Sequence, residues 1–103
     1  MTTATALAAE YAQGTLSPVE ATQAALEAIE KRDGELNAYC LVDADQALAQ
    51  ARESERRWRS GEQRSPLDGV PSSVKDVFLT KGWPTLRGSL CIDPAQPWEV
   101  DSP

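Results

Sequence analysis

Residues 66–78 read Pro66-Leu67-Asp68-Gly69-Val70-Pro71-Ser72-Ser73-Val74-Lys75-Asp76-Val77-Phe78, and residues 82–89 continue with Gly82-Trp83-Pro84-Thr85-Leu86-Arg87-Gly88-Ser89. The prolines and glycines disfavour a helix, whereas Val70, Val74 and Phe78 suit a covered strand. Because side chains alternate along a strand, Ser73 and Lys75 are expected on the same face. A lysine within an apolar strand is costly unless it is paired or neutral, which indicates a strand end or a chemical role.

These two runs resemble the motif of the amidase signature family. The family's run is Gly-Val-Pro-x-Ser-Val-Lys-Asp, preceded by Pro-Leu-x and followed by Gly-x-Pro-Thr-x-x-Gly-Ser, and the chain matches it densely over residues 66–89. Two positions depart from the pattern. Ser72 stands where an apolar residue is usual, and Asp68 stands where the family often has histidine.

The resemblance implies a fold and a mechanism. The fold is α/β, a large mixed sheet wrapped by helices in which the motif strand is interior. The mechanism cleaves amides with a serine nucleophile, a second serine on a cis peptide, and a lysine, which maps onto Lys75. A serine attacks efficiently only after a neighbour removes its proton, and a lysine can do so only when it is neutral. The resemblance gives Ser73 a supporting role beside Lys75.

The two serines of that mechanism are not recognisable in this sequence. The family's Gly-Gly-Ser-Ser-Gly-Gly region and its nucleophile would both follow Pro103. Residues 1–103 are therefore expected to be an incomplete, N-terminal segment of an amidase signature domain, inactive toward amides by itself. The strand within 66–89, cut at Pro103, is expected at a sheet edge, where apolar edges invite self-association or leave the chain loosely packed.

Three functions are considered for this chain. The first is a segment of an amidase that hydrolyses a small-molecule carboxylic amide. The second is a segment of a glutamine-hydrolysing amidotransferase subunit, which uses the same motif and binds partner subunits. The third is a stand-alone interaction module without catalysis. A homo-oligomer is compatible with each of them.

Composition excludes several other classes of function. A net charge of −6 over 103 residues disfavours nucleic acid or an anionic membrane as a partner. The chain has no histidine, which excludes His-dependent triads and His-ligated metal sites within it. No cofactor or metal is implied. Without a signal-peptide pattern or an apolar run of membrane-spanning length, and with Cys40 and Cys91 expected as free thiols, a cytoplasmic location is expected.

The first 65 residues are predicted to be mainly helical. A first helix spans 4–13 and stops at Gly14. A second begins with Ser17 as cap, Pro18 at the first position and Glu20 completing a capping box, and is expected to end at Gly34.

A short strand and a third helix are expected next. Residues 38–42 are apolar and β-prone, and Asp43 then caps a helix with Gln46 three positions later. On that helix Glu53 is expected to pair with Arg57, and Glu55 with Arg59. The cluster Arg52, Arg56, Arg57 and Arg59 is interpreted as a solvated face, and residues 61–65 as a polar loop.

Overall fold

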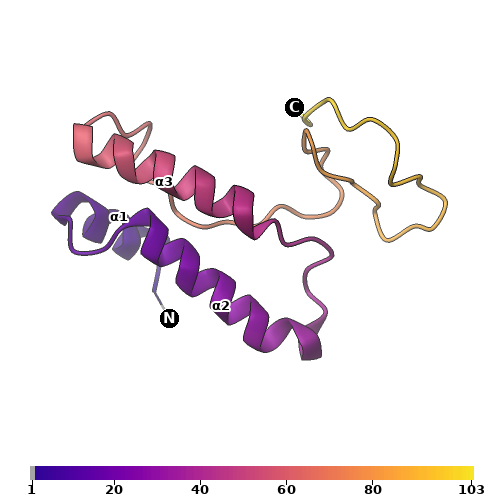
Figure 1. Ribbon diagram of the computed structural model, residues 1–103, viewed down its shortest axis with the longest axis horizontal. Helices are drawn as coiled ribbons and strands as arrows, with labels where there is room; N and C mark the ends of the chain where they lie inside the picture. The colour runs from indigo at the N-terminus through magenta and orange to yellow at the C-terminus, as the bar shows by residue number, and fades with distance from the viewer. Residues whose placement is uncertain (1) are drawn as a thin grey trace. The chain divides into compact units, whose positions relative to one another are not determined.

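The computed structural model describes residues 2–103 and divides the chain into two compact units. The first unit ends at Pro71 and the second comprises Ser72–Pro103. Three helices lie in the first unit: α1 (Ala4–Gln13), α2 (Pro18–Leu36) and α3 (Ala44–Ser60), which Figure 1 labels. Residues 2–103 form no strand, only an isolated bridge between Thr80 and Trp83.

The predicted helix starts are confirmed. Ser17 Oγ accepts the amide of Glu20 at 3.1 Å, and the Glu20 carboxylate accepts the amide of Ser17 at 2.9 Å, so the capping box is complete. Pro18 follows at the first helical position, where its missing N–H has no intrahelical role. At α3, Asp43 Oδ1 accepts the amide of Gln46 at 3.0 Å.

The end of α2 differs from the prediction. The helix continues through Gly34 to Leu36, and Asn37 ends it in the left-handed region, with φ 49° and ψ 42°. Asn37 donates to the Asp33 carbonyl at 2.8 Å, and asparagine tolerates this conformation better than most residues. Gly34 was therefore the wrong terminator, whereas Gly14 does end α1 with φ 69°.

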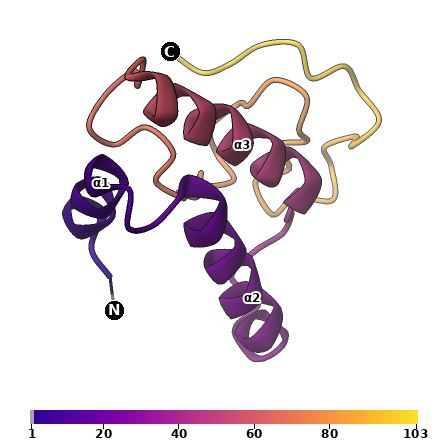
Figure 2. The ribbon, with the colours of Figure 1, turned by 60° about the vertical axis from the view of Figure 1, so that its left-hand side comes forward.

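The predicted strand at 38–42 is also wrong. The amides of Ala38 and Tyr39 donate to Asp33 Oδ1 at 2.7 and 3.1 Å, so the end of α2 holds the donors that a ladder would have used. Residues 38–42 form an irregular connection whose side chains are exposed. This connection lets the chain reverse, and α3 returns antiparallel beside α2 in Figures 1 and 2.

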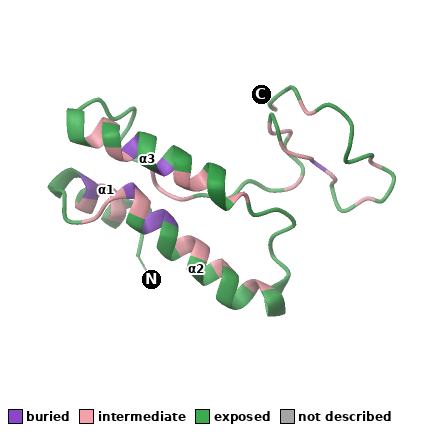
Figure 3. Cartoon of the chain, in the orientation of Figure 1, coloured by how far each residue is buried: buried purple, intermediate pink, exposed green. Residues whose placement is uncertain are grey.

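Small residues bring the helices of the first unit close together. Ala21 and Thr22 of α2 and Ala51 and Ser54 of α3 are buried, and Tyr11 of α1 is the large aromatic among the buried side chains. Figure 3 shows these buried positions on the inner sides of the three helices. Most of the larger apolar residues of α2 are only half-buried.

The second unit is irregular. Its C-terminal part runs beside residues 79–82, because Ser102 exchanges two hydrogen bonds with Leu79, at 2.9 and 2.7 Å, and the Gly82 amide donates to the Trp98 carbonyl at 2.8 Å. Thr85 is 3% exposed and its hydroxyl donates to the Phe78 carbonyl at 3.2 Å. These contacts close residues 79–102 into one loop.

The predicted strand at 70–78 is wrong for this structure. Residues 71–75 have no strand partner within 2–103, and the amides of Val77 and Phe78 both donate to the Lys75 carbonyl, at 2.7 and 3.1 Å, forming a turn. Val74, Val77 and Phe78 are exposed. Segment 66–89 therefore lies at no sheet edge, and of the expected α/β fold only the helical part is observed.

Cys40 and Cys91 are free thiols, as expected. None of the helices within residues 2–103 combines the length and apolar character that a membrane crossing requires.

Candidate functional site

Lys75 and Ser73 lie in the second unit, in the irregular segment that precedes the 75–78 turn. The side chains of both residues are exposed. The next residue, Asp76, is half-buried, and its Oδ1 accepts the amide of Leu86 at 3.1 Å. The parts of the motif that lie in this unit, 72–78 and 82–89, are thus tied together by Asp76 and by the Thr85 hydroxyl.

The first half of the motif begins in the first unit, where Asp68 forms a largely buried ion pair with Arg57. Arg57 Nε donates to Asp68 Oδ2 at 2.7 Å, and Arg57 Nη2 donates to Oδ1 at 2.6 Å. The Arg57 side chain is 18% exposed and that of Asp68 is 6% exposed. The pair is bidentate, a geometry that fixes the orientation of both planar groups.

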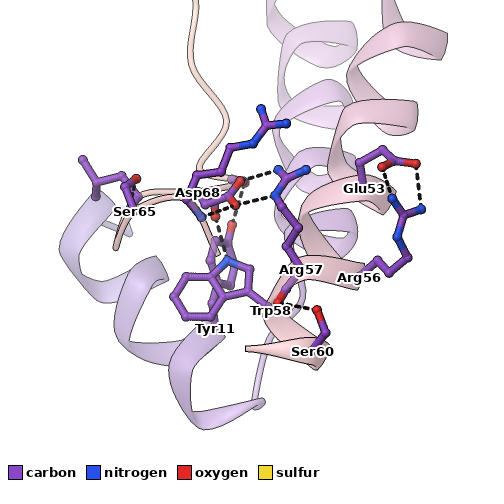
Figure 4. A network of polar contacts seen from close by, with 11 residues as sticks. Tyr11, Glu53, Arg56, Arg57, Trp58, Ser60, Ser65 and Asp68 are labelled. Carbon is purple, nitrogen blue, oxygen red and sulfur yellow. Dashed lines mark hydrogen bonds and ion pairs between the residues drawn. The ribbon is translucent and has the colours of Figure 1, made fainter. Parts of the chain in front are cut away.

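Two aromatic side chains hold the main chain at the same place. Trp58 Nε1 donates to the Asp68 carbonyl at 2.8 Å, and the Tyr11 hydroxyl donates to the Gly69 carbonyl at 3.2 Å. The two rings meet edge to face, with centroids 6.0 Å apart. Figure 4 shows Tyr11, Trp58 and Arg57 converging on Asp68. We call Tyr11, Arg57, Trp58, Asp68 and Gly69 the Asp68 cluster.

Gly69 is required by both its conformation and its surroundings. Its φ is +83°, a region that L side chains rarely adopt. A Cβ at this position would lie 2.8 and 2.9 Å from Pro18 Cβ and Cγ, and would also overlap Ser54 Oγ. The motif's glycine therefore lets the main chain pass directly against α2 and α3.

The charges in the cluster favour the ionised carboxylate. Hydrogen bonds from Arg57 hold the pKa of Asp68 well below its usual range, against the opposing effect of burial, and the Arg64 amide adds a further bond of 3.0 Å. The Ser54 hydroxyl is buried and has no partner at ordinary hydrogen-bond geometry within residues 2–103, although its proximity lowers the Asp68 pKa further. Burial, and secondarily Glu10, raises the pKa of Tyr11.

The ion pairs predicted on α3 are partly corrected. Glu55 does pair with Arg59, at 3.1 Å, but Glu53 pairs with Arg56 instead of Arg57. Arg56 and Arg59 are largely exposed, as a solvated face requires, whereas Arg57 is not part of that face. Local helical spacing could not reveal this, because the partner of Arg57 lies beyond the end of its helix.

Other features of the first unit do not involve the predicted site residues. A groove of about 680 Å³ lies beside Tyr11 and Trp58, between the α1–α2 turn and the C-terminal half of α3, and neither Ser73 nor Lys75 lines it.

Across residues 2–103, no three His, Cys, Asp or Glu side chains gather closely enough to hold a metal ion.

A family model described as Amidase matches residues 20–102. The chain belongs to the amidase family. The matched range includes α2 from Glu20 onward, α3, Asp68 and the whole of the 66–89 motif, so the resemblance seen in the motif extends over most of the chain.

Curated relatives of this amidase-family chain are named as the same component of glutamyl-tRNA(Gln) amidotransferase. That of Anaeromyxobacter sp. strain K is 47% identical over 78 residues, covering 76% of this chain and 16% of the relative. That of Thermobifida fusca is 47% identical over 87 residues, covering 84% and 18%. That of Streptomyces coelicolor is 43% identical over 91 residues, covering 88% and 18%. The chain thus spans less than a fifth of the length of these relatives.

The sequence patterns located the motif but missed the Asp68 cluster. In the sequence, Asp68 stands out only as a departure from the family's usual histidine, and nothing local links it to Tyr11 or Trp58. A tyrosine on the first helix and a tryptophan on the third were the signal that could have revealed the cluster. A buried tyrosine hydroxyl or indole N–H usually has a hydrogen-bond partner.

Proposed function

We propose that this chain is the segment of an amidotransferase subunit that contributes the catalytic lysine, Lys75, for releasing ammonia from an amide. The observation that carries the proposal is the 47% identity with the glutamyl-tRNA(Gln) amidotransferase component of Thermobifida fusca over 84% of the chain. The proposed setting is the α/β amidase domain, with a mixed sheet, that the motif implies. Among the functions considered from sequence, this one agrees with the names of the relatives.

The chemistry follows from the residue types. Lys75 would take the proton of a serine nucleophile, directly or through a second serine, and so activate the hydroxyl for attack on an amide carbonyl. Ser73 would support the Lys75 amine. Both serines of the mechanism would come from the remaining part of such a domain, since the motif-flanking serines of this chain lack glycine-rich surroundings suited to an oxyanion site.

The proposal also assigns a substrate and partners. The relatives carry the name of an enzyme that acts on glutamyl-tRNA(Gln), so this chain is proposed to work within an assembly of the same kind. The net charge of −6 does not favour direct contact with the nucleic acid. We therefore assign this segment to the amide-cleaving step and leave contact with the tRNA to other parts of the assembly.

A chimera tests this assignment. The matched 87-residue segment of the Thermobifida fusca relative is replaced by the corresponding residues of this chain, and the chimera is assembled with the other subunits of that enzyme. Ammonia release from glutamine and amidation of glutamyl-tRNA(Gln) are then measured, with a linear aliphatic amide as the competing substrate.

We expect the chimera to release ammonia from glutamine and to support amidation. A chimera that folds and assembles but hydrolyses only the linear amide would favour the simple amidase. A folded, assembled chimera without any amide cleavage would contradict the enzymatic assignment and favour the interaction module.

A further inference from the structure

We propose that Asp68 is a positioning residue for Lys75, because the Asp68 cluster fixes the main chain from which the Lys75 segment leaves the first unit. This inference rests on the proposed function, since it assumes that Lys75 acts in amide cleavage. It concerns residues that the motif does not mark as catalytic, and it assigns them an effect on turnover beyond their effect on stability.

The contacts of the cluster hold the main chain itself. Two of its hydrogen bonds end on consecutive carbonyl oxygens, from Trp58 to Asp68 and from Tyr11 to Gly69. In addition, the Arg57 guanidinium fixes the Asp68 side chain by donating to both of its carboxylate oxygens. Donors from two helices, α1 and α3, therefore determine where residues 68–69 lie and how their peptide planes are oriented.

The surroundings leave this part of the chain little freedom. Gly69 packs so closely against Pro18 and Ser54 that not even a Cβ fits. The Val70 amide donates to the Leu67 carbonyl at 3.1 Å, which closes a turn over residues 67–70. This turn is held by an ion pair and by hydrogen bonds to its main chain, and it ends five residues before the motif lysine.

The distance along the chain is short enough for the anchor to affect Lys75. Lys75 follows Gly69, the last residue of the Asp68 cluster, by six residues, a span of at most about 22 Å of extended chain. A general base must approach its proton donor to hydrogen-bonding distance, and a displacement of about 1 Å can reduce the rate about 100-fold. A loosened anchor would thus spread the Lys75 amine over unproductive positions without altering the groups that bind substrate.

The test uses the chimera described above with matched variants. Asp68→Asn removes the charge that Arg57 holds, while Arg57→Lys keeps the charge and loses the two-pronged geometry. Ala51→Gly is the control for stability, because Ala51 is buried on α3 and belongs to neither the Asp68 cluster nor the motif. For each variant kcat and KM for ammonia release from glutamine, and the Tm, are measured.

We expect Asp68→Asn to lower kcat by about 10- to 100-fold with KM within about twofold of the parent chimera. Arg57→Lys should lower kcat less than Asp68→Asn. Ala51→Gly should lower the Tm and leave kcat within about twofold. If Asp68→Asn loses no more kcat than Ala51→Gly at a comparable fall in Tm, the cluster is merely structural and the inference is wrong.

Two further variants keep the result decisive. If Asp68→Asn does not fold, the decision passes to Tyr11→Phe, which removes one hydrogen bond to Gly69 but keeps the ring; it should lower kcat about threefold to tenfold, and an unchanged kcat would overturn the inference. Lys75→Ala separates the two proposals. An active Lys75→Ala chimera contradicts the proposed function, whereas an inactive one beside a fully active Asp68→Asn contradicts only the positioning role.

Discussion

Arg57 holds both carboxylate oxygens of Asp68, at 2.7 and 2.6 Å, across the end of α3. Asp68 lies eleven positions after Arg57 in the sequence. The pair therefore joins α3 to the turn at residues 66–69, unlike the ion pairs that connect successive turns of one helix. A buried carboxylate without a partner is costly, whereas this one is surrounded by donors. The pair therefore makes the fold of the first unit sensitive to the ionisation of Asp68.

Acid should weaken the first unit through this carboxylate. The pKa of Asp68 is lowered in the folded state, so its contribution to the free energy of unfolding is complete above the unfolded value of about 4 and is lost as the pH falls further. Asp68→Asn is expected to cost about 1–3 kcal/mol at pH 7 and to lose less stability between pH 5 and pH 2.5 than the parent chain.

Urea unfolding measures this difference, with Trp58 fluorescence as the signal in a background where Trp83 and Trp98 are phenylalanine. Glu53→Gln is the matched control, because Glu53 is also ion-paired but half-exposed, and surface pairs contribute little. Parallel pH profiles for Asp68→Asn and the parent chain would show that Asp68 does not carry the acid sensitivity.

Gly69→Ala should be the most damaging glycine substitution in the first unit. It combines a φ of +83° with overlap against Pro18 and Ser54. Gly61 also has a positive φ, of +72°, but a Cβ there would meet nothing within 4 Å. Gly69→Ala is therefore expected to lower the free energy of unfolding by about 1–3 kcal/mol more than Gly61→Ala, because the overlap adds to the backbone strain. Similar losses in urea unfolding would mean that the close approach is not maintained in solution.

Gly34→Ala should have the opposite sign. Gly34 lies inside α2, and a Cβ there meets nothing within 4 Å. Alanine should stabilise the first unit by about 0.5–1 kcal/mol, since glycine loses more backbone freedom than alanine in a helix. Gly14→Ala, at a φ of +69°, serves as the destabilising reference. Circular dichroism during thermal unfolding distinguishes them, and a lowered Tm for Gly34→Ala would argue that α2 ends at Gly34 after all.

Sequence predicted those parts of the fold that depend on neighbouring residues. The caps at Ser17 and Asp43 and the stop at Gly14 are local, because each involves donors and acceptors within five positions. The two strands, at 38–42 and 70–78, were wrong because a strand exists only when another strand accepts its hydrogen bonds. Residues 2–103 supply no such partner strand. In segment 38–42, the amides of Ala38 and Tyr39 donate to the Asp33 carboxylate instead.

The candidate site likewise has features that the local sequence predicts and features that depend on tertiary contacts. The motif placed Lys75 and Ser73 in the family pattern by sequence alone, and their roles remain predictions. The partner of Arg57 could not be found from helical spacing, which favoured Glu53. Asp68 became its partner only through the turn that brings residues 66–69 back onto α3, a tertiary arrangement with no signature in the local pattern.

The most direct test of the central claim compares Lys75→Ala with Lys81→Ala in the assembled chimera. Lys81 is the other lysine of the second unit, exposed like Lys75 and only six positions away, so it controls for the loss of a charge in this segment. The rate of ammonia release from glutamine should fall by at least about 100-fold for Lys75→Ala, the contribution expected of a general base, and stay within about twofold for Lys81→Ala. A Lys75→Ala protein that folds, assembles and keeps more than about a tenth of the parent turnover would contradict the assignment of Lys75 as the catalytic base.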